Sequence, residues 1–431
     1  TKAFKAFVAW YDFTQRHDGG DRRIGAGRRR HGMRVLFNLT EVAGMSAVLT
    51  AGTIRSAGKA RAAWDPWLLG CTFVLLALGV IMVHSASVAY ADREMHNSVY
   101  FLVRHAAYAV LGLLFMAFTM RTRVRWWEKA GPFLLLLGIA SLCVVLVPGI
   151  SVHINGSSRW IRLGIVNLQP SEFMKLFMVV YVAGYLVRKQ EALKNFTQGI
   201  VMVSLVVAAI GILLLLEPDM GSLVVITVTV FSMLFLGGVR FWHFMCVLGA
   251  GIGSMVLLTL VSPYRMARAT SFLDPWADPF NTGFQLVQAL IAFGRGEWFG
   301  VGLGASVQKL FYLPAAHTDF VFAVMGEELG LIAVLGVMAV FGVVIARAFA
   351  IARQAEAAGQ IYGARLAQGL GLLLGSQAMI NMGVNMGLLP TKGLTLPFVS
   401  YGGSSMIMSC IAMGLLLLIG REAAASGWRK S

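Results

Sequence analysis

Charged side chains are scarce in this sequence. Asp, Glu, Lys and Arg together make up 13% of the 431 residues, whereas hydrophobic residues make up 58%. Soluble globular domains carry roughly 25% charged residues. The composition therefore excludes an ordinary water-soluble domain and indicates a protein that lies within a membrane.

Cysteine is also rare, and patterns that bind metals or nucleotides are missing. The four cysteines all fall within long apolar runs: Cys71, Cys143, Cys246 and Cys410. Their spacing matches no metal site, so we expect neither a disulfide framework nor a structural metal. The chain has no G-x-x-x-x-G-K-[ST] pattern, so a nucleotide-binding role is not expected.

Long apolar runs dominate the remainder of the chain. A membrane-spanning helix needs about 20 mostly apolar residues, and ten runs approach or exceed that length. They lie near residues 67–89, 99–120, 131–148, 171–187, 198–216, 220–238, 241–261, 319–346, 366–388 and 400–420. The sequence thus predicts an all-α, polytopic membrane protein with about ten transmembrane helices.

Basic residues are distributed unevenly between the two sides of these spans. With the N-terminus inside, 26 Lys and Arg residues fall on the cytoplasmic side and eight on the outer side, as the positive-inside rule requires. We expect cytoplasmic termini, with a basic extension over residues 1–66 that is not a secretory signal, a membrane domain over 67–421 and a basic tail over 422–431. The excess of Lys and Arg on the cytoplasmic side, and their attraction to anionic lipid headgroups, account for most of the net charge of +16. No nucleic-acid partner is therefore expected.

The longest predicted connection, residues 262–318, lies on the outer side between the seventh and eighth spans. It is rich in aromatic residues, which disordered segments lack, so we expect an ordered and functional loop. Phe284, Val287, Leu290 and Ile291 recur at helical spacing and predict a short amphipathic or re-entrant helix. The five glycines between 294 and 304 fit either a phosphate cradle or a series of tight turns.

Several ionisable residues stand inside predicted spans, where charge is costly unless it is paired or lines a cavity. Glu172 and Lys175 are three residues apart and can form an ion pair on one helix face, either structural or part of a cavity. Arg104 needs either an anionic partner, for which Glu172 is one candidate, or an outward cavity. Glu327 and Glu328 are adjacent, so they point about 100° apart and only one is expected to face the interior.

A polar stripe runs along the ninth span, where Gln377, Asn381 and Asn385 repeat every four residues. Hydrogen bonds between helices explain such a stripe without any catalysis. The alternative is that the stripe lines a polar cavity.

The sequence P-A-A-H-T-D-F at 314–320 lies where the long loop returns to the membrane. Asp319 there either favours the positive end of the helix that follows or acts as a general base on a lipid-linked substrate. His317 stands two residues before it. The basic residues of the outer loops are candidates to hold phosphates or are ordinary solvated charges: Arg159, Arg162, Arg265, Arg268 and Lys309.

Six motifs, in this order, resemble those of the SEDS family of bacterial cell-wall proteins (shape, elongation, division and sporulation). They are N-G-S-S-R-W at 155–160, Q-P-S-E-F-M-K at 169–175, E-P-D-M-G-S at 217–222, L-D-P-W-A-D-P at 273–279, A-H-T-D-F-V-F-A-V-M-G-E-E-L-G at 316–330 and L-P-T-K-G-L-T-L-P-F-V-S-Y-G-G-S-S at 389–405. Together they run through most of residues 66–421. The P-T-K-G sequence around Lys392 and the N-G-S-S-R-W sequence resemble the cell-division branch of the family more than its elongation branch.

The resemblance implies a glycosyltransferase that polymerises lipid II, the undecaprenyl-diphosphate-linked disaccharide peptide, into β-1,4 glycan strands of peptidoglycan. It places the reaction on the outer face of the bacterial cytoplasmic membrane, at the division septum. It also implies a class B penicillin-binding protein as the crosslinking partner, and other membrane proteins of the division complex. The family's essential aspartate corresponds to Asp319, and its intramembrane ion pair to Glu172 and Lys175.

The reaction that the resemblance implies inverts the anomeric carbon in one displacement, with Asp319 taking the proton from the acceptor 4-hydroxyl. Arg159, Arg265 and Lys392 are the candidates for stabilising the leaving diphosphate. A divalent cation, Mg²⁺ or Mn²⁺, is a candidate helper at the diphosphate, and no other cofactor is expected. The expected cavity residues are Glu172, Lys175, Arg104, His317 and Glu327.

Two functions of other classes stay open. The intramembrane charges and the polar stripe also fit a transporter that moves lipid II across the membrane. The basic N- and C-terminal segments also fit a non-enzymatic scaffold that recruits division proteins. Neither alternative explains an ordered loop of this length on one side of the membrane.

Overall fold

The computed structural model describes residues 64–149, 151–154, 157–163, 166–195, 197–262, 266 and 270–427. Most of the predicted N-terminal extension lies outside these residues, as do Arg265 and Arg268, two of the predicted phosphate-binding candidates. Helices make up most of the described chain. The predicted all-α class is therefore confirmed.

Each of the ten predicted spans coincides with a helix. These helices are α3 (Pro66–Met95), α4 (Tyr100–Arg121), α5 (Val124–Val145), α6 (Pro170–Arg188), α7 (Met202–Leu216), α8 (Met220–Leu236), α9 (Phe241–Val261), α12 (Val321–Ala357), α13 (Ile361–Asn385) and α14 (Gly403–Gly427). Among the described residues, seven helical stretches are long and apolar enough to cross a membrane, namely α3 to α7, α12 and α14. Of the other three, α8 and the apolar part of α9 are shorter, and α13 carries the polar stripe.

Short elements occupy the connections. A 3₁₀ helix η1 (Glu191–Lys194) and a π-helix η2 (Thr197–Val201) lead into α7, and α11 (Phe284–Gly296) lies in the long loop before α12. The loop helix predicted from the spacing of Phe284, Val287, Leu290 and Ile291 is therefore confirmed. It packs against α12.

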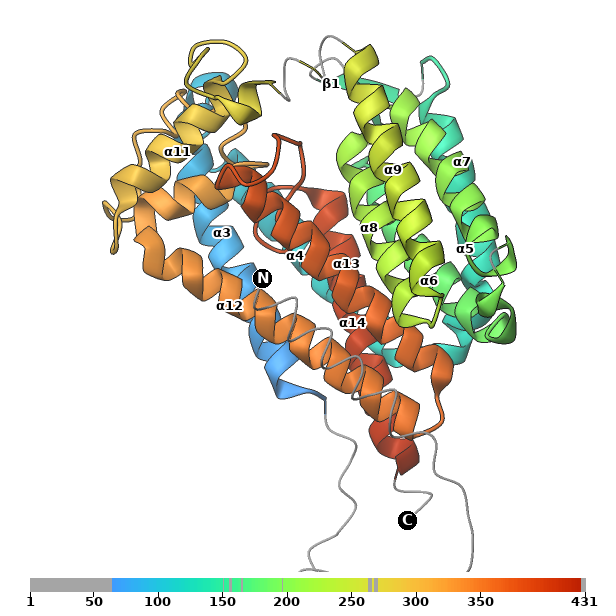
Figure 1. Ribbon diagram of the computed structural model, residues 1–431. Helices are drawn as coiled ribbons and strands as arrows, with labels where there is room; N and C mark the ends of the chain where they lie inside the picture. The colour runs from blue at the N-terminus through green and yellow to red at the C-terminus, as the bar shows by residue number, and fades with distance from the viewer. Residues whose placement is uncertain are drawn as a thin grey trace, which may run out of the picture. The chain divides into compact units, whose positions relative to one another are not determined.

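A three-stranded antiparallel sheet, which the sequence did not predict, lies between α5 and α6. Its strands β1 (Ser151–Ile154), β2 (Ser157–Leu163) and β3 (Val166–Leu168) are arranged in that order, with Ile161 opposite Leu168. β2 contacts α5 and α6, and β3 contacts α14. Figure 1 shows β1 and α11 at the same end of the helix bundle.

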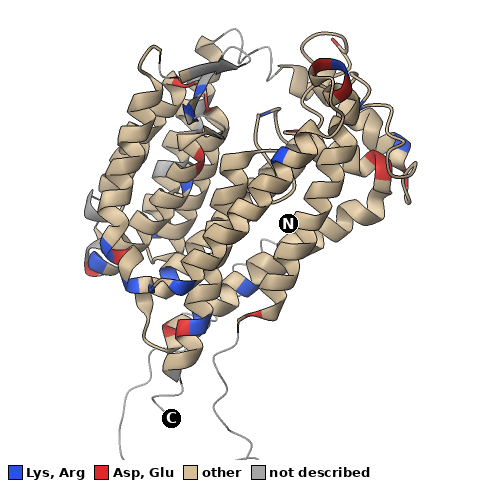
Figure 2. Cartoon of the chain, turned by 180° about the vertical axis from the view of Figure 1, so that it is seen from behind, with Lys and Arg blue, Asp and Glu red and all other residues tan. Residues whose placement is uncertain are grey.

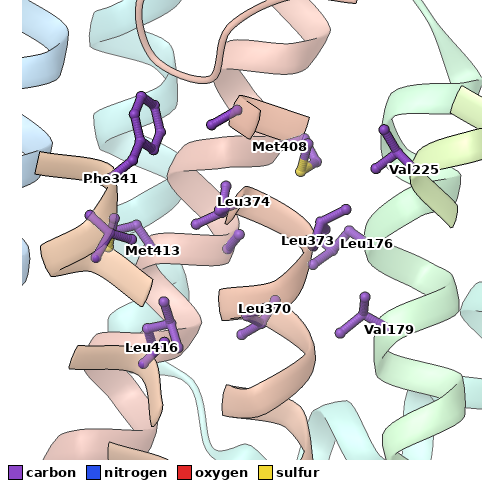
Figure 3. Close-up of a cluster of buried hydrophobic side chains, with 14 of the residues drawn as sticks. Leu176, Val179, Val225, Phe341, Leu370, Leu373, Leu374, Met408, Met413 and Leu416 are labelled. Atoms are coloured by element: carbon purple, nitrogen blue, oxygen red, sulfur yellow. The ribbon is translucent and has the colours of Figure 1, made fainter. Parts of the chain in front are cut away.

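Helix α13 lies in the middle of the bundle and packs against α6, α8, α12 and α14. Its buried Leu370, Leu373 and Leu374 lie between Leu176 of α6 on one side and Phe341 of α12 on the other (Figure 3). Charged residues gather at the two ends of the bundle, and the region between them is almost free of charge (Figure 2). This distribution is the one expected of helices whose middle parts face hydrocarbon.

The start of α3 is fixed by a carboxylate cap. Asp65 Oδ1 accepts from the N–H groups of Trp67 (3.0 Å) and Leu68 (3.2 Å), and Pro66 occupies the first helical position, where its missing N–H costs nothing. The same carboxylate accepts from Arg347 Nε of α12 at 3.0 Å. The cap therefore also joins two helices at this end of the bundle.

Helix α12 is interrupted at Gly330, whose φ of 75° lies outside the helical region. At the break, N–H groups of α12 donate to backbone carbonyls of the segment that follows α11, instead of to carbonyls of α12 itself. Leu331 N donates to Glu297 O at 2.9 Å, and Ile332 N donates to Trp298 O at 3.3 Å. The long loop thus supplies hydrogen-bond acceptors to the backbone of α12.

Candidate active site

Asp319 lies two residues before α12 and is half-buried. Its backbone carbonyl accepts two hydrogen bonds from the polar stripe of α13, from Asn381 Nδ2 (2.9 Å) and Asn385 Nδ2 (3.0 Å). Asn385 Oδ1 in turn accepts from Ala323 N at 3.1 Å. The stripe therefore clamps the start of α12, and with it Asp319, onto α13.

The same stripe holds the loop between α13 and α14. Asn381 Nδ2 also donates to Leu394 O at 2.5 Å. A Cβ atom on Gly393 would stand 3.0 Å from Asp319 Oδ2, so the Asp319 carboxylate lies directly against this loop. Lys392, the neighbouring residue, reaches the start of α8, where its Nζ lies 3.0 Å from Met220 Sδ. The H-T-D and P-T-K-G motifs thus meet at Asp319.

Glu172 and Lys175 form the predicted buried ion pair, with 2.8 Å between Oε1 and Nζ. Lys175 Nζ also donates to Gln377 Oε1 at 2.8 Å, and Gln377 Nε2 donates to Thr395 O at 3.1 Å. A chain of bonds therefore runs from α6 through α13 to the loop beside Asp319. This arrangement supports a structural role for the pair, because it anchors the loop that lies against the carboxylate.

Asp219 of the E-P-D-M-G-S motif caps α8 and was not singled out from the sequence. Its carboxylate accepts from Ser222 N (3.2 Å), Ser222 Oγ (2.8 Å) and Ser171 Oγ (2.7 Å). Ser171 lies in the first turn of α6, so the aspartate joins α6 to α8. The S/T/D cap pattern before an apolar run was the available signal in the sequence.

Arg159, predicted to hold the diphosphate, lies on β2 and binds backbone carbonyls. Its Nε donates to Glu217 O at 3.1 Å, and its Nη2 donates to Pro218 O. Both side-chain oxygens of Glu217 are buried without a hydrogen-bond partner. Burial, with a smaller contribution from Asp219, raises the pKa of Glu217 to about 8, so this carboxyl group is protonated near neutral pH.

His317 packs among three aromatic rings. Its ring centroid lies 5.6 Å from that of Tyr90, 4.6 Å from Phe101 and 5.8 Å from Tyr401. Its carbonyl accepts from Tyr401 N at 3.0 Å. Burial lowers the pKa of His317 to about 4, so the ring is neutral and fixes the position of the H-T-D segment.

Arg104 does not pair with Glu172, so that candidate pairing was wrong. Its guanidinium carbon lies 4.7 Å from the centre of the Tyr100 ring, and its charge lies near the Tyr401 side chain. Glu172 is instead paired with Lys175, three residues away on α6. A cation over an aromatic face satisfies the arginine without an acid.

The prediction that only one of Glu327 and Glu328 faces the interior was also wrong, since both are fully buried. Glu327 accepts from Arg295 Nη1 (2.9 Å) and from loop N–H groups. Glu328 accepts from Lys309 Nζ (2.7 Å) and from Ser85 Oγ. The two side chains project about 100° apart from the helix. Both nevertheless point into protein, because the long loop folds around the start of α12.

The glycines that follow α11 serve close approach and turns. Gly300 has a φ of +81°, and a Cβ there would stand 2.2 Å from Glu328 O. Gly302 (φ +104°) and Gly304 (φ +80°) also adopt conformations that favour glycine. The tight-turn interpretation is confirmed at these three positions. Lys309, another predicted phosphate-binding candidate, is the ion-pair partner of Glu328.

No metal site emerges around Asp319 in the described part of the chain, where no three His, Cys, Asp or Glu side chains gather closely enough to hold an ion. The Asp319 carboxylate lies against Gly393, and the Asp319 backbone carbonyl is held by the amides of Asn381 and Asn385.

Known proteins resemble this chain over most of its length. A family model described as "Cell cycle protein" (FtsW, RodA, SpoVE) matches residues 66–425. The chain is 54% identical over 358 residues to the "Probable peptidoglycan glycosyltransferase FtsW" of Nitrosococcus halophilus, covering 83% of this chain and 92% of that protein. It is 49% identical to the protein of the same name from Coxiella burnetii, covering 84% and 98%.

Solved structures show the same fold. A chain from "Structural coordination of polymerization and crosslinking by a peptidoglycan synthase complex" has a TM-score of 0.68 and 29% identity, covering 84% of this chain and 98% of that one. The rod shape determining protein RodA of Thermus thermophilus has a TM-score of 0.60 and 27% identity, covering 84% and 97%. This chain therefore belongs to the FtsW/RodA/SpoVE family of cell cycle proteins, the SEDS family, and is a multi-pass membrane protein.

Proposed function

We propose that this protein is a peptidoglycan glycosyltransferase that polymerises lipid II during cell division. The observation that carries the proposal is the meeting of the H-T-D and P-T-K-G segments at Asp319, held by buried amides of α13. Relatives about half identical over most of the chain are named as probable peptidoglycan glycosyltransferases of the FtsW type. A fixed carboxylate of this kind is what general-base catalysis requires.

The proposed topology places both termini in the cytoplasm and the loop over 262–318 on the outer face of the cytoplasmic membrane. The excess of Lys and Arg on the other side supports this orientation. Asp319 then lies at the outer mouth of the bundle, where a polyprenyl-linked sugar presents its headgroup. We further propose that the protein is enriched at the division septum, where this synthesis is needed.

In the proposed mechanism, Asp319 takes the proton from the 4-hydroxyl of the acceptor sugar while that oxygen attacks the anomeric carbon of the donor. The bond from the anomeric carbon to the diphosphate breaks in the same step, and the configuration inverts. General-base help of this kind contributes roughly 10² to 10⁴ in rate. His317 stays neutral and holds the segment in place.

The leaving diphosphate needs positive charge nearby. Lys392 is the first candidate, because it lies in the loop between α13 and α14, next to Gly393, which lies against the Asp319 carboxylate. Arg159 has two of its donor groups engaged by carbonyls at the end of α7 and is the weaker candidate. Arg265 lies outside the described residues. A divalent cation bound through the diphosphate would add charge at the same place, and no proton transfer is assigned to it.

We also propose that the chain works with a class B penicillin-binding protein that crosslinks the new strands, and with other membrane proteins of the division complex. A structural relative was solved in a study of polymerization and crosslinking by a peptidoglycan synthase complex. At 29% identity over nearly the whole of that chain, a similar assembly is a reasonable expectation for this protein.

The test is glycan synthesis from purified lipid II by the protein with its penicillin-binding partner in nanodiscs. Asp319→Asn should abolish polymer while leaving lipid II binding intact. Asp274→Asn, which changes an exposed aspartate of the same loop, is the matched control and should retain normal activity. Normal polymer from Asp319→Asn would refute the assigned role.

Two other outcomes would favour the alternative functions. Movement of labelled lipid II across a bilayer without polymer would identify a transporter, although Lys175 and Gln377 are bonded to neighbouring groups rather than exposed along a path. Normal cell division by the Asp319→Asn protein would favour a non-enzymatic scaffold.

A further inference from the structure

Residues 298–308, which follow α11, form an uncharged segment that exposes large apolar side chains. Trp298 is 63% exposed, Phe299 81% and Leu303 60%. No Asp, Glu, Lys, Arg or His occurs between Glu297 and Lys309. An exposed apolar surface of this kind marks a contact with lipid or with another protein.

The start of this segment is fixed beside a membrane helix. Glu297 and Trp298 accept backbone hydrogen bonds from α12 just after its break at Gly330. The next turns of α12 expose Ile332 and Leu335, each 52% exposed. Because α12 is long and apolar enough to span the membrane, this face of the helix contacts lipid. The exposed side chains of the segment extend the same apolar surface.

The backbone of the segment is also suited to lipid. Irregular backbone is excluded from hydrocarbon when its N–H and C=O groups lack partners. Here the N–H groups of Gly300, Val301 and Gly302 donate to carbonyls of α11 and α12 at 2.7, 3.0 and 3.1 Å. The segment can therefore lie at membrane depth without leaving these polar groups unpaired.

We propose that residues 298–303 insert into the bilayer beside α12, at the boundary between headgroups and acyl chains, and contact lipid directly. Trp298 suits this boundary because its ring is largely apolar and its N–H can reach water. The insertion ties the long loop to the membrane surface, since the carbonyls of Glu327 and Glu328 hold the same segment to α12. The proposal rests on α12 crossing the membrane and is independent of the reaction proposed above.

The test uses nitroxide labels in the full chain reconstituted in nanodiscs. All four native cysteines are first replaced by serine: Cys71, Cys143, Cys246 and Cys410. Single cysteines are then introduced by Phe299→Cys and Leu303→Cys. Leu335→Cys on α12 is the lipid-facing control, and Gln190→Cys, at an exposed turn after α6, is the water-facing control. Power saturation compares access of oxygen, which concentrates in lipid, with access of a water-soluble nickel chelate.

The expected result is that labels at 299 and 303 have the oxygen-over-nickel ratio of the Leu335 control, several-fold above that of the Gln190 control. Two results would overturn the proposal. High access to the nickel chelate would place the segment in water. Low access to both reagents would show that protein covers it. Using two positions guards against one label that disturbs folding, and a thermal unfolding curve checks each labelled protein.

Discussion

Asn381 joins the two segments that meet at Asp319, so replacing it with leucine tests whether those segments position the carboxylate. The side chain is 1% exposed, and its Nδ2 donates to the carbonyls of Asp319 (2.9 Å) and Leu394 (2.5 Å). Leucine is similar in size but has no donor. Asn381→Leu therefore removes both bonds while keeping the helix packed.

The size of the expected loss of stability follows from the hydrogen bonds that the two carbonyls keep in Asn381→Leu. The Asp319 carbonyl keeps its bond from Asn385, whereas the Leu394 carbonyl loses the donor that the asparagine supplied. A net hydrogen bond contributes about 0.5–1.5 kcal/mol, and a buried group left unpaired costs about 1–3 kcal/mol. We expect the free energy of unfolding to fall by about 2–3 kcal/mol. We expect kcat for glycan synthesis to fall about 10²-fold, because a catalytic group displaced by about 1 Å loses that much.

The assay pairs thermal unfolding in nanodiscs with kcat and KM for lipid II polymerisation. Ser376→Ala is the matched control, since Ser376 Oγ lies on the same helix, 3.2 Å from both Thr229 Oγ1 and Leu373 O, and bonds to neither segment of the site. It should lower stability slightly and leave kcat unchanged. An equal fall in kcat for the two variants, or a raised KM for Asn381→Leu with normal kcat, would refute the positioning argument.

Three further changes test other parts of the structure by unfolding measurements. Lys175→Met should cost about 3–5 kcal/mol because it leaves Glu172 as a buried unpaired charge, and adding Glu172→Gln should restore most of that loss. Gly300→Ala should destabilise more than Gly302→Ala, because both positions have positive φ but only the first places a Cβ 2.2 Å from a carbonyl. Burial raises the pKa of Glu217 from 4.5 to about 8. The folded state therefore keeps a proton that the unfolded state loses, and stability falls as pH rises between these values. Glu217→Gln should flatten this dependence.

The spans were predictable because the bilayer imposes a length that few apolar runs reach by chance. Even α13, which does not meet a simple apolar criterion, was predicted from the apolar run near residues 366–388. The ion pair of Glu172 and Lys175 was predictable for a similar reason, since the spacing of three residues alone places both side chains on one helix face.

Contacts between distant segments were not predictable from helical geometry. The burial of both Glu327 and Glu328 depends on a loop that wraps around the start of α12, and no pattern within α12 indicates that loop's path. Arg104 likewise finds an aromatic partner supplied by its own helix and by Tyr401. The short strands over 151–168 have neither the length nor the clear alternation that would separate them from an irregular loop.

The polar stripe of α13 was predictable from its spacing, whereas the partners of its hydrogen bonds were not. The sequence predicted that the stripe either forms hydrogen bonds between helices or lines a cavity. In the structure, the side-chain amides of Gln377, Asn381 and Asn385 donate largely to the backbone carbonyls of Thr395, Leu394 and Asp319. A transport path needs polar groups that exchange partners with a moving substrate. Groups committed to the backbone instead fix a geometry, so the stripe supports a rigid reaction site at one end of the bundle over a path through it.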